Sequence, residues 1–497
     1  VSNTTASNNT AVGYQAGYAN TTGAQNTFVG NISGDANTSG SENTSLGYWS
    51  LTENTTGNHN VALGSRSLKS NTTASDIVAV GYQSLYSNTT GADHVAIGHT
   101  ALYSNTTGAT NVAVGQASLN ANTTGSKNTA LGTQALRFNT TGSNHTAVGY
   151  QALYTAAAGG YNTAVGDKAN YLTTTGNYNT SLGAAALYSN TTASYNTAVG
   201  YQAGYTNTTG NVTAFGAQAL KSNTTGSYNT AVGGSALQSN TTANFNTSLG
   251  FQSSYTNTTG GYNTAVGYLS LFSNTTGGTN TAVGHQSAYL NTTGTANAAF
   301  GIYALKNNTT GASNTALGYA TLFSGAVTTV QENTFIGQKS GNYLNTTTTG
   351  TANALVGAYM RTDGAGTNFA SGLGYNVECA GGYTTLGQGT NDIRAAHGNV
   401  TWATVSDERY KKDITDATAG LSFINDLTPR TFKYKNLGEL PDTFNAYKEG
   451  STDVFKNSRT NHGFIAQEVK TAIDAHPEIK DGFNMWDDRE DGSQEVA

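Results

Sequence analysis

Two side chains near the C-terminus have a spacing that could do chemistry: Ser406 and Lys411 lie five positions apart in the segment Ser-Asp-Glu-Arg-Tyr-Lys. A serine hydroxyl is a poor nucleophile at neutral pH unless a nearby base takes its proton. A lysine amine can be that base when burial lowers its pKa, and Ser-Lys pairs are a known variant of the catalytic triad. The other interpretation is structural, with Ser406 capping a helix that continues into solvated charged residues.

Two further motifs follow this segment. The first is Leu-Thr-Pro-Arg-Thr-Phe-Lys-Tyr at residues 427–434, and the second is Gly-Phe-Ile-Ala-Gln-Glu-Val at residues 463–469. Ala472 and Ile473 come after the second motif at a spacing that gives a helix one apolar face. The second motif therefore predicts a strand or turn that leads into an amphipathic helix.

Taken in order, the three motifs resemble the intramolecular chaperone of tailspikes and tail fibres, the self-cleaving family of the endosialidase C-terminal domain. The resemblance implies a small α+β domain over residues 403–497 that holds three chains in register. It also implies that Ser406 and Lys411 form a catalytic dyad that cuts a peptide bond adjoining Ser406, on a side that the sequence leaves open. Family members usually continue into a final helical stretch, so the resemblance implies a truncated module in a sequence that ends at Ala497.

A seventeen-residue repeat fills most of the sequence before this module. Each repeat has a short apolar strand, an anchor glycine, usually a leucine four places later, and a polar turn that is most often Asn-Thr-Thr-Gly. One residue is missing before Gly216, and the period then resumes. A short fixed period indicates a supersecondary unit that stacks on copies of itself. The regular anchors are Gly13, Gly30, Gly47, Gly64, Gly81, Gly98, Gly115, Gly132, Gly149, Gly166, Gly183, Gly200, Gly216, Gly233, Gly250, Gly267, Gly284, Gly301 and Gly318.

The residues of one repeat predict a β-solenoid coil with two short strands and two turns. Before the glycine, larger and often β-branched residues alternate with a small residue, which is strand periodicity. Asn, Thr and Gly dominate and proline is absent before Pro429, which excludes helical repeats and suits a ladder in which nearly every amide donates. We expect each anchor glycine where the backbone needs a positive φ or a close approach. Coils about 4.8 Å apart would make a rod on the order of 100 Å long.

The Asn-Thr-Ala-Val-Gly strand resembles the head repeats of trimeric autotransporter adhesins, and near-identical repeats occur in phage tail fibres. The resemblance covers roughly residues 5–390 and implies an all-β shaft, a β-roll or β-helix, assembled as a parallel homotrimer. A coil this small buries little surface alone, so lateral association of several chains would add stability. The repeat here is longer, its turns differ, and no membrane anchor of the adhesin type is recognised, which favours a fibre over an adhesin.

The repeat becomes irregular after Gly318, where the next anchors are Gly337, Gly357, Gly374 and Gly387. Repeat arrays change in this way where they are capped or where they carry function. The first interpretation is a transition that ends the solenoid, and the second is a receptor-contacting tip in which aromatic rings stack on sugars. We therefore divide the chain into a regular shaft (1–325), an irregular capping or receptor region (326–402) and the C-terminal chaperone (403–497). The aromatic residues of the middle part include Tyr343, Tyr359, Phe369, Tyr375 and Tyr383.

Composition excludes several classes of function. Only 10% of the residues are charged, and residues 1–400 hold ten basic and ten acidic side chains, so the net charge of −6 falls in the last fifth. A neutral shaft lacks the basic stripe that nucleic-acid binding needs. No apolar run approaches the length of a membrane span. The eight histidines are scattered without ligand spacing and no phosphate-cradling loop is present, so we expect no metal and no cofactor, and the single Cys379 cannot form an intrachain disulfide.

Asparagines of the Asn-X-Thr type recur in nearly every repeat, for example Asn54, Asn71, Asn88, Asn105 and Asn122. In a secreted eukaryotic protein they would predict N-linked glycans. In a fibre they would form turns, with the side-chain amide bonding nearby backbone. We favour turns.

These observations predict a phage tail fibre in the virion that attaches to a host cell and matures by self-cleavage. Its expected partners are two further copies of itself, a host surface glycan or protein receptor, and the baseplate or other fibre proteins, with no nucleic acid and no membrane insertion. The alternative is a bacterial or extracellular surface adhesin with glycosylated turns. An enzyme acting on host polysaccharide is disfavoured because the shaft offers no paired carboxylates in a plausible cleft.

Overall fold

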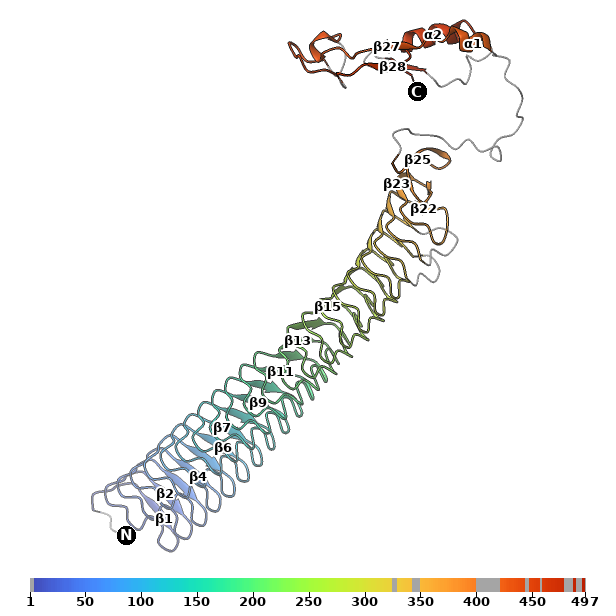
Figure 1. Ribbon diagram of the computed structural model, residues 1–497. Coiled ribbons are helices and arrows are strands. Elements are labelled where there is room, and N and C mark those ends of the chain that lie inside the picture. The colour runs from blue at the N-terminus through green and yellow to red at the C-terminus, as the bar shows by residue number, and fades with distance from the viewer. Residues whose placement is uncertain are drawn as a thin grey trace. The chain divides into compact units, whose positions relative to one another are not determined.

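In the computed structural model the chain divides into two compact units, Val1–Val405 and Ser406–Ala497. The two units differ in kind: the first is a long stack of β-coils, and the second is small and mixes helices with strands (Figure 1). The structure describes residues 4–323, 329–341, 349–398, 421–442, 447–455 and 458–477, and the backbone of residues 486–488 and 494–496.

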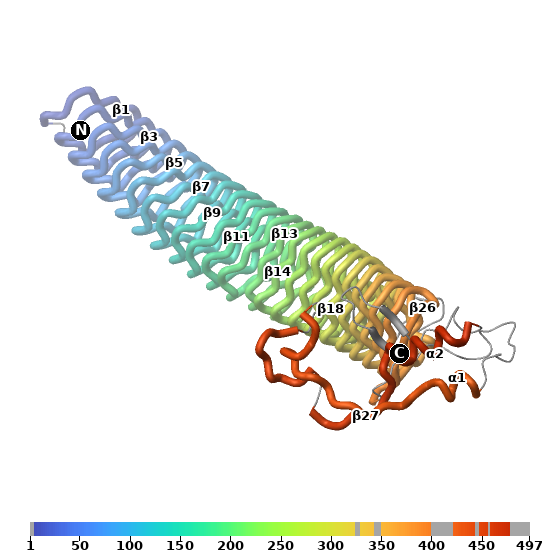
Figure 2. Tube along the Cα trace, turned by 90° about the horizontal axis from the view of Figure 1, so that it is seen from above, coloured from blue at the N-terminus to red at the C-terminus, as the bar shows by residue number. Residues whose placement is uncertain are grey.

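The first unit is a parallel β-solenoid, the all-β architecture that the repeat predicts. Each coil contributes one strand, and consecutive strands pair in parallel along one axis (Figures 1 and 2). The solenoid strands are β1 (Thr10–Val12), β2 (Thr27–Val29), β3 (Thr44–Leu46), β4 (Val61–Leu63), β5 (Val78–Val80), β6 (Val95–Ile97), β7 (Val112–Val114), β8 (Thr129–Leu131), β9 (Thr146–Val148), β10 (Thr163–Val165), β11 (Thr180–Leu182), β12 (Thr197–Val199), β13 (Val212–Phe215), β14 (Asn229–Val232), β15 (Thr247–Leu249), β16 (Thr264–Val266), β17 (Thr281–Val283), β18 (Ala298–Phe300), β19 (Thr315–Leu317), β20 (Thr334–Ile336), β21 (Ala354–Val356), β23 (Ser371–Tyr375) and β25 (Tyr383–Gln388).

The register between strands reproduces the spacing of the sequence repeat. Thr146 of β9 pairs with Thr163 of β10, seventeen residues on, and the same offset holds along the regular shaft. At the shortened repeat the offset falls to sixteen, so that Thr197 of β12 pairs with Thr213 of β13. The missing residue is therefore absorbed in a turn and the strand register is kept.

The anchor glycine is required by the backbone. Gly149 has a φ of 131°, and a Cβ added there would lie 2.5 Å from the carbonyl oxygen of Gly166 in the next coil. Both expectations, a positive φ and a close approach, are confirmed. The expectation of two strands per coil is wrong, because one strand per regular coil is present in the described shaft. Gln151 and Leu153, which follow the glycine, both have a positive φ near 50°, and so the chain cannot extend there.

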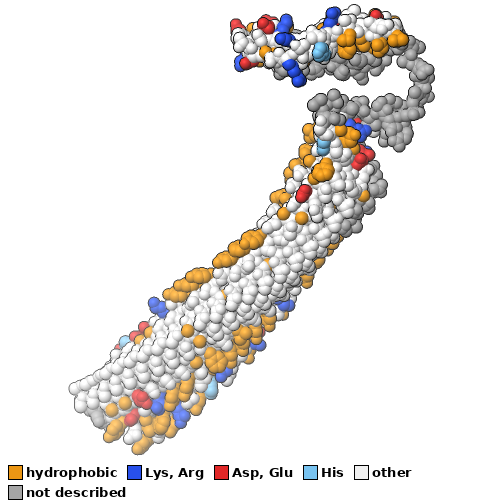
Figure 3. Space-filling view, in the orientation of Figure 1, with side chains coloured by type: hydrophobic (Ala, Val, Ile, Leu, Met, Phe, Trp, Pro, Cys, Tyr) orange, Lys and Arg blue, Asp and Glu red, His pale blue; other side chains and the backbone are white. Residues whose placement is uncertain are grey.

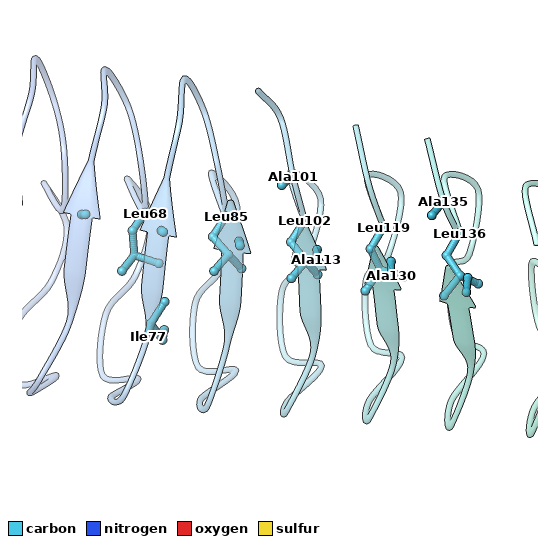
Figure 4. Close-up of a cluster of buried hydrophobic side chains, with 14 of the residues drawn as sticks. Leu68, Ile77, Leu85, Ala101, Leu102, Ala113, Leu119, Ala130, Ala135 and Leu136 are labelled. Carbon is cyan, nitrogen blue, oxygen red and sulfur yellow. The ribbon is translucent and has the colours of Figure 1, made fainter. Parts of the chain in front are cut away.

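Positions in a coil are numbered below from its anchor glycine, so that −1 precedes it and +1 follows it. The core of the coil at Gly149 includes Ala147 at −2 and Leu153 at +4, which are both fully buried. Figure 4 shows the same two positions repeated in neighbouring coils, where the leucines are Leu68, Leu85, Leu102, Leu119 and Leu136. Burial of a leucine side chain is worth about 1.5–3 kcal/mol. The shaft is thus held together by a narrow apolar row that runs along its length.

Two rows of buried asparagines run beside this core. At +7, the Nδ2 of Asn274 donates to the Oδ1 of Asn257 in the preceding coil at 2.8 Å and to the carbonyl of Gly277 at 2.8 Å. At −4, the Oδ1 of Asn111 accepts the backbone N–H of Asn128 at 2.9 Å. Each asparagine therefore joins its own coil to a neighbour, and the two turns of the coil are closed by side chains.

The parallel array ends in an antiparallel hairpin. β25 pairs in parallel with β23 and, on its other side, antiparallel with β26 (Asn391–Ala396). A second small pair, β22 (Arg361–Thr362) with β24 (Glu378–Cys379), lies in the same irregular region. β26 carries Asp392 and Arg394, and charged side chains on an edge strand discourage the addition of another strand. This region contains the end of the parallel solenoid array.

The second unit is a small α+β region, also as expected. β27 (Arg430–Phe432) pairs antiparallel with β28 (Asn461–Gly463), and a short segment joins β28 to the amphipathic helix α2 (Ala466–Asp474). The buried residues of α2 are Val469, Ala472 and Ile473. The predicted strand-to-helix transition over residues 463–473 is therefore confirmed. The elements are α1 (Leu421–Asp426), β27 (Arg430–Phe432), the 3-10 helix η2 (Leu437–Glu439), β28 (Asn461–Gly463), α2 (Ala466–Asp474), β29 (Trp486–Asp488) and β30 (Gln494–Val496).

Candidate functional site

The predicted dyad lies outside the part of the chain that the structure describes. Ser406 and Lys411 both fall between residues 398 and 421. The dyad stays a prediction. What the structure does define is the scaffold formed by the two downstream motifs.

The two downstream motifs contact one another directly. Arg430 of β27 belongs to the first motif and Glu468 of α2 to the second. The Nε of Arg430 donates to Oε2 of Glu468 at 2.8 Å, and Nη2 donates to Oε1 at 2.7 Å. Hydrogen bonding from the guanidinium lowers the pKa of Glu468. A two-point Arg–carboxylate pair fixes an angle as well as a distance, so it orients the start of α2 against β27.

A shallow groove of about 350 Å³ lies beside this pair. At one end, Nε2 of His476 lies 2.8 Å from Oδ2 of Asp426, and the His476 ring meets the Phe423 ring edge-on, with centroids 5.5 Å apart. These contacts join α1 to the end of α2. The groove is open, and Thr428 and Thr471 carry the hydroxyl groups among its described lining residues. Its lining residues are Asp426, Thr428, Arg430, Glu468, Thr471, Ala472 and Ala475.

The asparagines that could have been glycan acceptors are buried in the shaft. Asn88 is fully buried, and its Nδ2 donates to Oδ1 of Asn71 at 3.0 Å and to the Gly91 carbonyl at 2.9 Å. An N-linked glycan is attached at that same nitrogen. The interpretation as turn-forming residues is confirmed, and in the folded shaft these amides are engaged in hydrogen bonds.

The outward side of the solenoid strands carries an apolar row. Position −1 holds Val, Leu, Ile or Phe in almost every coil, and Leu46, Leu182 and Leu249 each leave about half of their surface exposed. Figure 3 shows hydrophobic side chains gathered in long stripes on the shaft and few charged groups between them. Exposed apolar surface that continues in this way marks an interaction face. The row includes Val12, Leu46, Ile97, Leu131, Leu182, Phe215, Leu249, Phe300, Leu317, Val356 and Leu373.

Sequence reasoning missed two buried histidines. His94 and His145 stand at −4, where most coils have asparagine, and both are almost fully buried. Burial lowers the pKa of both, and that of His145 falls to about 4. Nδ1 of each ring accepts the backbone N–H of the next coil, from Asn111 and from Asn162, as an asparagine oxygen does elsewhere. Alignment of the repeats would have found them, because both interrupt an otherwise regular column.

No group of histidine, cysteine, aspartate or glutamate side chains that could hold a metal occurs in the described ranges. Within the same ranges, no helix is both long and apolar enough to cross a bilayer.

Comparison with known proteins bears on the C-terminal unit. Residues 406–476 match the protein-family model for the chaperone of endosialidase, a span that begins at Ser406 and includes both downstream motifs. No curated protein and no solved structure matches the chain. The chain therefore carries, after a β-solenoid of seventeen-residue coils, a C-terminal domain of the chaperone-of-endosialidase family.

Proposed function

We propose that this chain is a phage tail fibre or tailspike shaft that attaches the virion to a host cell and is assembled by its C-terminal chaperone. The match of residues 406–476 to the chaperone of endosialidase carries the proposal. A long, nearly uncharged solenoid next to such a domain suits a spacer between a particle and a cell surface. In this proposal residues 1–325 are the shaft, 326–402 the cap or receptor contact, and 403–497 the chaperone.

Three chains assemble in parallel in this proposal. The apolar row at −1 supports it, because side chains such as Leu182 and Leu249 are half exposed in a single chain and would be covered by a neighbouring shaft. The row runs the length of the solenoid, so parallel chains in register would contact one another in each coil. The chaperone domain supports the same arrangement by setting the register at one end before the coils form.

Maturation proceeds by one self-cleavage. Lys411 takes the proton of the Ser406 hydroxyl, and the oxygen attacks a peptide carbonyl adjoining Ser406. The C–N bond breaks and the amine leaves with the proton. Water then hydrolyses the ester that links the two fragments. Such a reaction happens once per chain, so the protein is not a turnover enzyme.

The receptor is a glycan or protein on the host surface, and the other partners are baseplate or fibre proteins. A surface adhesin with glycosylated turns is the weaker candidate, because the turn asparagines are buried and their Nδ2 atoms are engaged within the shaft.

The experiment uses the full chain with Ser406→Ala and Lys411→Ala variants. We expect two fragments from the wild type and one uncut chain from each variant by denaturing gel, and a threefold mass by native mass spectrometry for all three proteins. Lys412→Ala is the matched control, since it removes a neighbouring lysine and should leave cleavage unchanged. Equal processing of all variants would exclude the dyad, and a monomeric wild type would exclude the fibre assembly.

A further inference from the structure

Six aromatic rings stand on one edge of the shaft, at position −5. They are Tyr161, Tyr178 and Tyr195 in three successive coils, and Tyr228, Phe245 and Tyr262 in three more. Each leaves between 46% and 70% of its surface exposed. The two sets of three, called the aromatic strips below, are separated by the shortened coil before Gly216, which lacks a residue at this position.

The rings within each strip are stacked. Tyr178 lies 5.0 Å from Tyr161 and 5.3 Å from Tyr195 between ring centroids, with planes within 11° of parallel. Phe245 lies 5.2 Å from Tyr228 and 5.0 Å from Tyr262, with planes within 20° of parallel. Nearly parallel rings at this spacing are offset, so each overlaps its neighbour only in part. Three half-exposed rings present roughly 300 Å² of apolar surface, which is the size of a functional patch on a soluble protein.

The fold itself does not need aromatic residues at −5. The same position is polar or small in the other coils of the regular shaft, with Asp76, Lys127 and Asn144 before the strips and Thr279 and Ser313 after them. All of these residues share a positive φ near 60° with the rings. A bulky aromatic residue is uncommon in that conformation, and asparagine and aspartate suit it better. The rings therefore occupy an unfavourable backbone position without being buried, which points to a role in binding.

The residues beside the strips are short and uncharged. At −6, Oδ1 of Asn177 accepts the Gly160 N–H at 2.6 Å and Oδ1 of Asn244 accepts the Ser227 N–H at 2.7 Å, so these side chains stay close to the backbone. At −3, the threonine side chains point outward between the strips and the apolar row. The rings thus form an exposed row, stacked from coil to coil, with amide and hydroxyl groups along its margins. Between residues 146 and 262 the charged residues are Asp167, Lys168 and Lys221.

We propose that the aromatic strips bind a neutral polysaccharide that lies along the shaft. The sugar rings of such a polymer have apolar C–H faces that pack on aromatic rings, and hydroxyl groups at their rims that suit the amide and threonine margins. Lack of charge favours a neutral chain over an anionic one. Each strip is about 10 Å long between its outer ring centroids, enough for a few sugar units. The proposal rests on the proposed attachment function, and names a ligand class and a site for it.

Two other occupants fit the strips less well. A second shaft lying along this edge would contact position −5 in every coil, but that position holds Glu42, Asp76 and Asp93 in earlier coils. An extended peptide would need an unpaired strand edge, whereas the strands of these coils are paired on both sides.

The test compares three forms of the full chain by native electrophoresis in gels that contain dextran, galactomannan, soluble β-glucan or the anionic polymer alginate. In the strip variant all six rings become serine, the residue found at −5 in Ser313, so the coils should still form. The control variant carries Tyr14→Ser, Tyr150→Ser and Tyr201→Ser at +1, where the rings are as exposed as those of the strips. Circular dichroism checks that each form keeps its β-structure.

We expect at least one neutral gel to retard the wild type and the control equally, and the strip variant to bind at least tenfold more weakly. Equal binding by the strip variant, equal loss in the control, or no binding to any neutral polymer would overturn the proposal. Stronger retention by alginate would do so too. If native mass spectrometry shows that the strip variant alone dissociates, the strips are an interface between chains. A wild-type trimer that binds no glycan leaves the fibre assembly intact, whereas a monomeric wild type contradicts that assembly directly.

Discussion

The shaft and the C-terminal unit satisfy their polar groups in different ways. In the shaft, an asparagine such as Asn274 bonds to the coil before it, to its own turn and to the coil after it. In the C-terminal unit, the corresponding contact is a pair of exposed side chains, Arg430 with Glu468. In a row shared by many coils, each asparagine contributes to the stability of the adjacent coils. An exposed ion pair joins only its own two residues and contributes little.

The difference explains why the shaft can be long without a thick core. Each coil buries one larger side chain and a few small ones, which alone would leave it marginal. Stacking repeats the same apolar and amide contacts between every pair of coils. The free energy of unfolding is then nearly a sum of similar contributions from each coil and each interface between coils. A substitution in one coil therefore mainly affects that coil and its neighbours.

The largest loss of stability is expected when one asparagine is removed from the buried row at +7. Asn274→Ala leaves the Oδ1 of Asn257 without its donor and the Nδ2 of Asn291 without one of its acceptors. All three asparagines are buried. We expect a loss of about 3 kcal/mol in the free energy of unfolding, because buried polar groups without partners each cost about 1–3 kcal/mol. Urea denaturation gives the size of the loss. Hydrogen exchange should show it confined to the coils around residues 257–291.

Thr276→Ala is the matched control, because Thr276 belongs to the same turn and points into solvent. A change below about 0.5 kcal/mol is expected there. If both substitutions cost the same, the asparagine row has no special role in stability.

Acid should weaken the shaft at its two histidine coils. The pKa of His145 is lowered by burial from 6.5 to about 4, so the unfolded chain takes up a proton below pH 6.5 while the folded chain does not until about pH 4. The free energy of unfolding therefore decreases as the pH falls, by about 2 kcal/mol between pH 7 and pH 5.

His145→Asn restores the residue that other coils have at −4. We expect the variant to lose much less stability than the wild type between pH 7 and pH 5, as measured by urea denaturation at each pH. His99→Asn is the control, because His99 lies on the surface and stacks on Tyr82. An unchanged pH dependence in His145→Asn would show that other groups cause the acid sensitivity.

A natural gap in the row at +7 offers the opposite experiment. Ala156 stands where an asparagine is expected, and Oδ1 of Asn139 is left without a partner in the described structure. Ala156→Asn would supply the missing donor and should stabilise the shaft by about 1 kcal/mol. Ala158→Asn makes the same chemical change on the exposed side of the turn and should be neutral. Destabilisation by Ala156→Asn would mean that the site lacks room for the amide.

The same contrast decides what can be predicted from the sequence. The coil length and the role of Gly149 could be predicted because the anchor glycine recurs at the same spacing many times. The shortened coil stands out as the one interval of sixteen residues among the regular anchors. The single strand per coil could not be predicted, because it depends on the positive φ of Leu153. Leucine is an ordinary helix-forming residue, and only its packing against the neighbouring coils holds it in this turn. The aromatic strips were missed for a related reason: periodicity identifies a position, but not which way its side chain points at a corner.

In the C-terminal unit, motifs could be predicted and contacts could not. The strand-to-helix transition near Gly463 follows from apolar spacing alone. The pairing of Arg430 with Glu468 joins residues 38 positions apart, which no local pattern encodes. The prediction of a Ser406–Lys411 dyad depends on a motif alone, and the cleavage experiment tests the role of both residues.

The smallest effect is expected from the exposed pair of this unit. Glu468→Gln removes the charge that Arg430 binds but keeps an acceptor oxygen and the length of the side chain. Because both partners are in contact with solvent, the Coulomb gain is screened and the unfolding midpoint of the full chain should not change measurably. Val469→Ala, one residue along α2, is the contrasting control, since it empties a buried site and should lower the midpoint clearly. If Glu468→Gln proved as damaging as Val469→Ala, single pairs in this unit would be as important as the shared rows of the shaft, and the distinction between the two regions would fail.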